Sequence, residues 1–242
     1  MAPFGASRAG LMSTRVDAIP DSVLDQKADF RFAIVEGEGT EIEDSIGDND
    51  ATANFERWDD SEDWVGGWAK DGDGVDDHID VGTLGDFGSN LDNDWFLAFT
   101  IKTTDESNFI GFREDWDFVF STDSFGFGAA DDVVTFAIND EDGNNSQVET
   151  NTEVTDGNPH RLILNSIGPN PDDWEFYIDG SDDINVLEND SVSNVSNFPV
   201  AVYLLATNLD DNADMIIDNV IGGQNKITSE EATEDYNEQP WS

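Results

Sequence analysis

The chain of 242 residues contains no cysteine and no long run of apolar residues. Without cysteine it forms no disulfide bonds and performs no thiol chemistry. The longest apolar run, Phe198 to Ala206, is too short to cross a bilayer, so we expect no membrane insertion. The N-terminus carries Arg8 and Arg15 without an apolar segment behind them, and we therefore expect no secretory signal.

Basic residues are also scarce. The chain has 10 of them against 55 acidic residues, and its formal net charge is −45. Phosphates would repel such a charge, so we expect no nucleic-acid partner. A hydrophobic fraction of only 37% with a high net charge is typical of disorder. The chain nevertheless has 16 Phe and 7 Trp, many at alternating positions, which predicts a folded protein with a carboxylate-rich surface.

Such a surface suits concentrated salt. At about 1 M salt the Debye length is about 3 Å, so neighbouring carboxylates repel one another much less than in dilute buffer. In dilute buffer the same charge would destabilise the compact state. Because the acidic residues are spread along the chain and only four residues are lysine, we interpret the protein as halophilic. An acidic tail or a cation-binding protein is the alternative.

The first 28 residues differ from the rest in charge. They have no net charge, whereas residues 29–242 carry the whole −45. We predict an N-terminal docking arm (1–28) followed by one domain (29–242). The arm, roughly Ala2 to Asp25, would insert into a partner subunit through basic and apolar side chains, namely Phe4, Arg8, Leu11, Met12 and Arg15. A disordered terminus is the alternative.

Alternating apolar residues predict strands throughout the domain. The clearest hairpin joins Asp156–Leu164 to Trp174–Gly180, and Trp95 to Thr103 is the longest strand candidate. Many short strands separated by Gly/Asn turns predict an all-β antiparallel sandwich or jelly roll. A short C-terminal helix is expected after the capping box formed by Thr228 and Glu231.

Four motifs, in order, resemble the laminin G-like domains of the concanavalin A-like lectin/glucanase superfamily. They are EGEGTEIEDSIGDND (36–50), GWAKDGDGVDDHI (67–79), DGNPHRLIL with WEFYIDG (156–164 and 174–180), and IDNVI with ITSEE (217–221 and 227–231). The resemblance covers about Phe30 to Tyr236 and implies a jelly-roll β-sandwich. Lys70 and Gly72 depart from the family pattern, which usually has apolar residues there.

Some domains of this superfamily hydrolyse glycosides with two carboxylates about 5–9 Å apart. Related glucanases carry Glu-x-Asp-x-x-Glu on one strand, and the nearest segment here, Glu114 to Phe118, lacks that spacing. We therefore expect no enzymatic activity and no catalytic residue. His78 and His160 stand at turn or strand positions of the family and are interpreted as structural.

The resemblance also implies a structural Ca²⁺ and a glycan ligand. Oxygen ligands suit Ca²⁺, and Asp44, Asn49 and Asp218 stand in the relevant turn and closing strand. Solvated turn residues are the alternative. For a glycan, three tryptophans in an acidic stretch are candidates for stacking on sugar rings: Trp58, Trp64 and Trp68. The alternative is that they cover the sandwich, because Trp is highly buried on average.

These features together favour a non-enzymatic virion surface protein of a halophilic virus, such as a capsid turret, a capsid decoration or a tail-fibre head. The stretches Ala2–Thr14 and Ile19–Val23 resemble the starts of structural proteins from haloarchaeal tailed viruses. Expected partners are other virion proteins through the arm, further copies in a symmetric homo-oligomer, and a host-surface glycan. The protein would assemble in the host cytoplasm and then face brine on the virion surface. The alternatives are a carbohydrate-binding module or adhesin of a halophilic cell, and a glycoside hydrolase.

Overall fold

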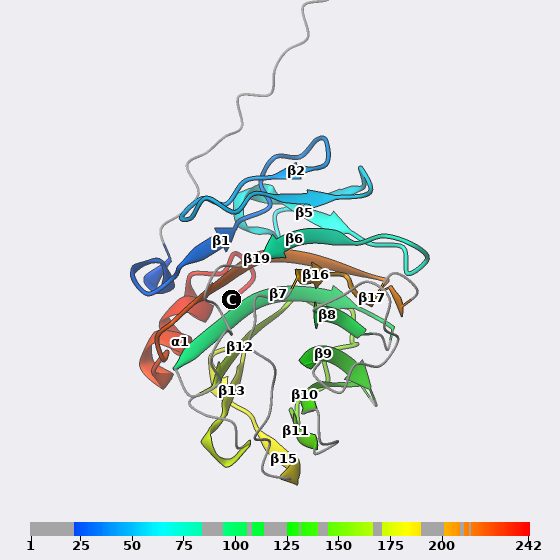
Figure 1. Ribbon diagram of the computed structural model, residues 1–242. Helices are drawn as coiled ribbons and strands as arrows, with labels where there is room; N and C mark the ends of the chain where they lie inside the picture. The colour runs from blue at the N-terminus through cyan, green and yellow to red at the C-terminus, as the bar shows by residue number, and fades with distance from the viewer. Residues whose placement is uncertain are drawn as a thin grey trace, which may run out of the picture.

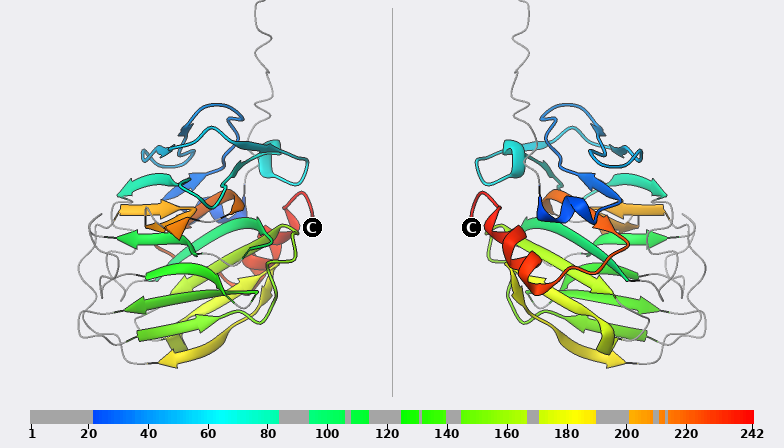
Figure 2. Two further views of the ribbon diagram at one scale, coloured as in Figure 1. Left: turned by 90° about the vertical axis from the view of Figure 1, so that its right-hand side faces the viewer. Right: turned by 90° about the vertical axis from the view of Figure 1, so that its left-hand side faces the viewer.

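Two β-sheets lie face to face, and the α-helix α1 (Ser229–Asn237) lies on the outer side of one of them (Figure 1). The computed structural model describes residues 22–83, 94–105, 108–113, 125–130, 132–139, 145–166, 171–189, 201–208, 211–212 and 214–242. Figure 2 shows the two curved layers and α1 from the sides. The predicted all-β antiparallel sandwich with a short C-terminal helix is confirmed. In these residues no helix is long and apolar enough to cross a membrane.

The first sheet has the strand order β14-β13-β12-β7-β19-β5-β4, with β1 added alongside β19. Its central strands, β7 and β19, are the longest in this layer, and they pair over most of their length with a shift in register after Asp218. Its strands in chain order are β1 (Phe30–Phe32), β4 (Trp58–Asp60), β5 (Trp68–Asp71), β7 (Trp95–Thr103), β12 (His160–Ser166), β13 (Glu175–Ile178), β14 (Ser181–Asp182) and β19 (Met215–Gly223).

The second sheet has the order β15-β11-β10-β9-β8-β16-β6-β3-β2. A short hairpin of β17 and β18 is added, and β17 runs parallel to β8. Three 3-10 helices complete the described elements: η1 (Val23–Gln26), η2 (Val65–Gly67) and η3 (Pro171–Asp173). The strands of this sheet are β2 (Glu41–Ile42), β3 (Ala51–Ala53), β6 (Ile79–Thr83), β8 (Asn108–Arg113), β9 (Phe125–Ala130), β10 (Val133–Asn139), β11 (Asn145–Glu149), β15 (Asn185–Asn189), β16 (Ala201–Leu204), β17 (Ala206–Asn208) and β18 (Asp211–Asn212).

The hairpin predicted from the DGNPHRLIL and WEFYIDG motifs is present. Strands β12 and β13 pair antiparallel, with Leu162 opposite Ile178 and Leu164 opposite Phe176. All four side chains point into the main core between the sheets, as the alternation of apolar residues requires. Strand β12 also pairs with β7, so the hairpin is joined directly to the centre of the first sheet.

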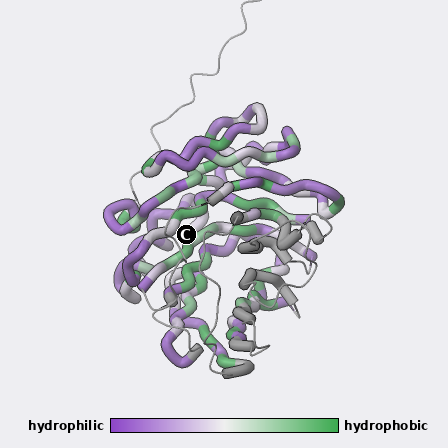
Figure 3. Tube along the Cα trace, in the orientation of Figure 1, coloured by the Kyte–Doolittle hydropathy of each residue, from purple (hydrophilic) through white to green (hydrophobic). Residues whose placement is uncertain are grey.

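Alternation along β7 divides the apolar residues between two layers. Leu97, Phe99 and Ile101 join the main core between the sheets, whereas Phe96 and Ala98 face outward into a second, smaller cluster. Figure 3 shows hydrophobic residues concentrated on these central strands and hydrophilic residues on the surrounding loops. The outward side of the first sheet is therefore a second buried face, which needs a cover of its own.

Helices η1 and α1 supply that cover. Leu24 of η1 and Ala232 of α1 are fully buried in the smaller cluster. Residues 22–28, which we assigned to the arm, therefore belong to the folded domain, and the boundary predicted at residue 28 is corrected to a position before Ser22. The end of β19 helps this segment to pack, because a Cβ at Gly223 would collide with the backbone of Lys27.

The capping box predicted for the C-terminal helix is confirmed. The backbone N–H of Glu231 donates to Thr228 Oγ1 at 3.2 Å, and Glu231 Oε2 accepts from the backbone N–H of Thr228 at 2.8 Å. These bonds satisfy two N–H groups that helix geometry alone would leave without a partner. The local sequence, through Thr228 and Glu231, therefore determines the residue at which α1 begins.

Candidate functional site

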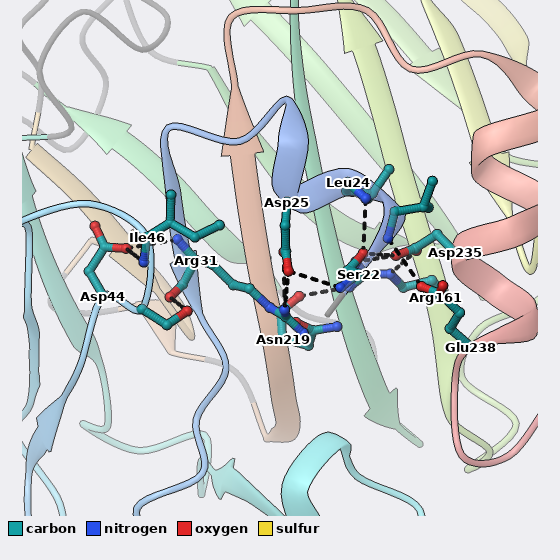
Figure 4. Close-up of polar contacts among 12 residues, drawn as sticks. Ser22, Leu24, Asp25, Arg31, Asp44, Ile46, Arg161, Asn219, Asp235 and Glu238 are labelled. Atoms are coloured by element: carbon teal, nitrogen blue, oxygen red, sulfur yellow. Dashed lines mark hydrogen bonds and ion pairs between the residues drawn. The ribbon is translucent and has the colours of Figure 1, made fainter. Parts of the chain in front are cut away.

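Polar side chains gather beneath η1 and α1, on the outward face of the first sheet. We call this group the clasp and define it as Ser22, Asp25, Arg31, Arg161 and Asp235. Figure 4 shows that its members come from the N-terminal segment, two strands and the helix, and that hydrogen bonds link them. The clasp therefore joins the start of the domain to its end across the sheet.

A fully buried ion pair holds α1 to the sheet. Arg161 Nε lies 2.7 Å from Asp235 Oδ2, and both side chains are 0% exposed. Arg161 Nη1 also donates to the backbone oxygen of Asn219 at 2.7 Å. Each charge is thus compensated inside the protein, which buried charges require.

The N-terminal segment is attached to the same helix. Ser22 Oγ donates to Asp235 Oδ1 at 3.0 Å, and the backbone N–H of Val23 donates to Glu238 Oε2 at 3.2 Å. Lys27 Nζ lies 2.7 Å from Glu231 Oε2. Three contacts from consecutive turns of one helix therefore fix the point at which the chain enters the domain.

Arg31 connects this segment to the centre of the sheet. Its Nη1 bonds both carboxylate oxygens of Asp25, at 2.9 and 3.0 Å, and its Nε donates to Asn219 Oδ1 at 3.0 Å. Asn219 has a φ of +46° and lies in the bulge of β19 that follows Asp218. Both arginines thus bond the bulge at Asn219: Arg31 bonds its side-chain oxygen and Arg161 bonds its backbone carbonyl.

Backbone N–H groups bond the carboxylate oxygens of Asp44 and Asp218, two of the predicted calcium ligands. Asp44 Oδ1 accepts backbone N–H groups from Arg31, Ile46 and Gly47, and its Oδ2 accepts one from Asn49. Four N–H donors surround this carboxylate, as Figure 4 shows in part for Oδ1. These four N–H donors compensate the Asp44 carboxylate within the protein, and its role as a calcium ligand stays a prediction.

Asp218 is likewise engaged by the protein. It is 0% exposed, its Oδ2 accepts from the backbone N–H of Val65 at 2.9 Å, and its Oδ1 accepts from the N–H of Asn219. Burial raises the pKa of Asp218 well above its ordinary range, although these bonds and the charges of Arg161 and Arg31 act in the opposite direction. Calcium binding stays a prediction, and calorimetric titration after chelator treatment would test it.

Another acidic group lies in the loop between β5 and β6. Carboxylate oxygens of Asp73, Asp76 and Asp77 lie within 4.8 Å of one another. Arg57 already supplies a cation, because its Nη1 lies 2.8 Å from Asp73 Oδ2 and its Nη2 bonds Asp77. The group is therefore an intramolecular ion-pair network.

The three predicted sugar-stacking tryptophans lie on β4, η2 and β5 but in different environments. Trp64 is 2% exposed, and Trp241 packs on it edge-on at 6.3 Å, so it has no free face for a sugar. Trp68 is half-buried and packs so tightly on Gly37 that a Cβ there would lie 2.6 Å from the indole. Trp58 is also half-buried. Of the three, Trp58 and Trp68 keep exposed edges, and their role in glycan binding stays a prediction.

Lys70 explains one departure from the family pattern. Its Nζ lies 3.9 Å from the centroid of the Trp58 ring and 4.9 Å from that of Phe55, and it donates to the backbone oxygens of Gly39 and Phe55 at 3.0 and 3.1 Å. The residue is 0% exposed, so its methylenes occupy a buried position although its end is charged. Burial lowers the pKa of Lys70 to about 8, against the opposing charges of Glu36 and Glu56.

We expect the free energy of unfolding of the wild type to rise with pH above about pH 8, and that of the Lys70→Met variant to lack this rise. The lysine pKa is about 8 in the folded protein and about 10.4 in the unfolded chain, so the unfolded chain binds more protons between these values. The free energy of unfolding of the wild type should therefore rise across this window by up to about 3 kcal/mol. Urea unfolding in molar KCl between about pH 7.5 and 9.5 measures the slope. Identical slopes for both proteins would contradict the assignment.

The remaining basic residues whose side chains are described all pair with carboxylates. Lys102 Nζ lies 3.9 Å from Asp63, and Lys226 bonds Glu175. Lys27, Arg31, Arg57 and Arg161 have carboxylate partners as well. Among the residues whose side chains the structure describes, every lysine and arginine except the buried Lys70 therefore has a carboxylate partner.

Sequence reasoning did not find the clasp. The predicted arm anchors Phe4, Arg8, Leu11, Met12 and Arg15 lie outside the described residues. Arg31 and Arg161 carried a usable signal, because each is a rare basic residue inside a strand that is otherwise apolar. In such a strand a charged side chain needs a buried partner.

No protein-family model and no curated protein sequence matches the chain. Among solved structures, it is similar to the binding domain of Paraclostridial Mosquitocidal Protein 1, with a TM-score of 0.66 and 12% identity over 88% of this chain and 52% of that one. Domain 4 of AbnA, a GH43 extracellular arabinanase from Geobacillus stearothermophilus in complex with arabinotriose, gives a TM-score of 0.62 and 12% identity, over 87% of this chain and 98% of that domain. A Trypanosoma rangeli sialidase gives 0.61 and 13% identity, over 90% of this chain and 33% of that one. The chain thus spans about half the length of the first of these proteins, and the likeness shows a shared β-sandwich fold.

Proposed function

We propose that this protein is a non-catalytic recognition domain on the surface of a halophilic virus particle. Its N-terminal arm holds it to other particle proteins, and its sandwich faces brine and binds a carbohydrate or glycosylated receptor of the host. The observation that carries this proposal is the division of charge. Acidic residues dominate the domain and its described surface cations are all paired, whereas the segment leading into the clasp has no net charge.

The binding role draws support from the fold. The similar region of the mosquitocidal protein is a binding domain, and the similar arabinanase domain is in complex with arabinotriose. The described buried carboxylates also have structural partners: Asp44 bonds backbone N–H groups, Asp235 pairs with Arg161, and Asp183 Oδ1 and Oδ2 bond Asn151 and Thr152. A hydrolase of this kind would need two carboxylates free to face a substrate.

The anchoring role draws support from the clasp. A domain that is held through its N-terminal arm receives any pull on that arm at the residues where the arm joins the domain. Here Ser22 and Lys27 are bonded to α1. Asp235 of α1 is bonded to Arg161 of β12, and Arg161 in turn bonds the Asn219 carbonyl of the central strand β19. The entry point is therefore connected to the most extensively paired part of the sheet.

Deleting residues 2–21 should abolish association with the particle and leave the domain folded. The deleted residues lie outside the described fold, whereas Ser22 and everything it bonds remain. Gradient sedimentation of particles at molar KCl, with circular dichroism of the free protein, measures both effects. A truncated protein that still co-sediments with particles would contradict the arm as the anchor.

Glycan recognition needs a separate test at the same salt. We expect the full chain to bind a subset of glycans on an array in molar KCl and to release no reducing sugar from them. Hydrolysis of any bound glycan would contradict the non-catalytic role. Glycan binding without particle association would favour the second candidate, a carbohydrate-binding module of a halophilic cell, which is supported by the match to 98% of the arabinanase domain.

A further inference from the structure

His160 at the start of β12 lies between two carboxylates. Its Nδ1 is 2.9 Å from Asp179 Oδ2, and its Nε2 is 3.2 Å from Asp156 Oδ1. The side chain is 9% exposed. Asp156 belongs to the turn before β12 and Asp179 to the turn after β13, so the imidazole joins the two turns at one end of the hairpin.

This geometry requires a doubly protonated ring. Both nitrogens face carboxylate oxygens, which only accept hydrogen bonds, so a neutral imidazole would direct one lone pair at a negative charge. Burial by itself would lower the pKa of His160, but the hydrogen bonds and charges of Asp179 and then Asp156 outweigh it, and the pKa lies above its ordinary value of 6.5. The ring is thus an imidazolium that acts as a cross-link.

The cross-link reaches α1 through the Asp179–Gly180 turn. Asp179 Oδ1 also accepts the backbone N–H of Arg161 at 2.9 Å. Gly180 packs directly on α1: its carbonyl accepts from Thr233 Oγ1 at 2.9 Å, and a Cβ there would lie 3.1 Å from Tyr236. The position of this turn therefore determines how α1 sits on the sheet.

We propose that His160 is a pH-sensitive latch for the docking of α1 and η1. When the imidazolium loses its proton, repulsion between the ring lone pair and a carboxylate loosens the Asp179–Gly180 turn. The looser turn then packs less firmly against α1. Because Ser22 is bonded to Asp235 of this helix, the N-terminal segment is held less firmly as well (Figure 4). The latch thus controls how firmly the N-terminal segment is held, and this inference does not depend on the identity of any ligand or particle.

The sign follows from the raised pKa. The contribution of His160 to stability is fully present below about pH 6.5 and is lost as the pH rises through the higher value of the folded protein. The charged groups that act on the ring are Asp179 and Asp156, and Tyr236 of α1 is near Asp179. The pKa of Asp156 is lowered, with burial opposing and bonds from Asn158 and His160 prevailing, and the pKa of Tyr236 is raised by burial and then by Asp179. Neither shift brings the group nearer to neutral pH.

Hydrogen exchange of the full chain in molar KCl tests the latch. Between about pH 6 and 9, after correction for intrinsic rates, we expect opening of α1 and η1 in the wild type to increase about tenfold, as loss of one charge-assisted hydrogen bond allows. The His160→Gln variant should open readily already at the lower pH and change little. The His78→Gln variant is the matched control, because His78 is the other histidine of the chain and lies directly before β6, where its Nδ1 is 3.4 Å from the Asp76 carbonyl oxygen. It should behave like the wild type.

A wild type with pH-independent opening of α1, or a His160→Gln variant that keeps the wild-type pH response, would overturn the proposal. If that variant does not fold, the wild type still decides the question. Its two histidines give two imidazole titrations by NMR, which His78→Gln assigns. A pKa of His160 at or below the ordinary value of 6.5 would overturn the latch.

Discussion

Replacing Asp235 by alanine should lower the free energy of unfolding by about 3–5 kcal/mol, because it leaves the Arg161 charge buried without its partner. In the wild type the two side chains lie 2.7 Å apart and are 0% exposed. The variant also removes the acceptor of Ser22 Oγ, so the N-terminal segment should loosen together with α1. Urea unfolding in molar KCl, followed by tryptophan fluorescence, measures the loss.

An exposed ion pair of the same protein provides the control. Lys226 bonds Glu175, but their side chains are 35% and 33% exposed. Replacing Lys226 by methionine should therefore cost less than about 1 kcal/mol. The double variant Arg161→Met/Asp235→Leu should recover part of the loss, because two apolar side chains leave no buried charge. A loss below about 1 kcal/mol for Asp235→Ala would show that Arg161 reaches water or another partner.

The parts of the fold predicted correctly from sequence are those determined by neighbouring residues. Alternation over Trp95 to Thr103 gave strand β7 with the same bounds, and the motifs at 156–180 gave the β12–β13 hairpin. The capping box of Thr228 and Glu231 needs only three residues of separation. In each case the signal is a local periodicity or spacing that tertiary packing reinforces.

The domain boundary could not be predicted from charge, because a segment can lack net charge for two reasons. It can avoid the solvent, or its charged residues can pair with others inside the folded domain. We interpreted the balanced charge of residues 1–28 as a sign that the segment avoids the solvent. For its last part the balance has another origin: Asp25 pairs with Arg31 and Lys27 with Glu231, both inside the folded domain. Opposite charges near one another in space need not be near one another in sequence, so composition cannot distinguish the two cases.

The contacts of the clasp and of His160 could not be predicted from the sequence for a similar reason. His160 and Asp179 are separated by 19 positions, and Arg161 and Asp235 by 74. Only the pairing of the strands and the packing of α1 bring them together. The sequence showed Lys70 only as a basic residue at a position where the resemblance implies an apolar one, yet the side chain is buried and its ammonium lies over the rings of Trp58 and Phe55. A residue name alone does not say which part of an amphipathic side chain is buried.

Transfer from about 3 M to about 0.1 M KCl should unfold the protein, because the Debye length grows from under 3 Å to about 10 Å. With a net charge of −45, carboxylates that are screened in brine then repel one another across the surface. The described surface cations offer little relief, since each already pairs with a carboxylate of its own. Circular dichroism and tryptophan fluorescence across a KCl series should show one cooperative transition.

Two controls separate screening from other effects of concentrated solutes. Sucrose favours compact states by exclusion from the protein surface but screens no charge, so it should not replace KCl. The triple variant Glu38→Gln/Asp48→Asn/Glu62→Gln removes three exposed charges and should shift the transition to lower KCl. A protein that stays folded in about 0.1 M KCl, or a triple variant that needs more salt than the wild type, would contradict a surface adapted to brine. In that case the acidic residues would have to bind a partner. The difference in net charge between the arm and the domain would then no longer support the proposed anchoring role of the arm.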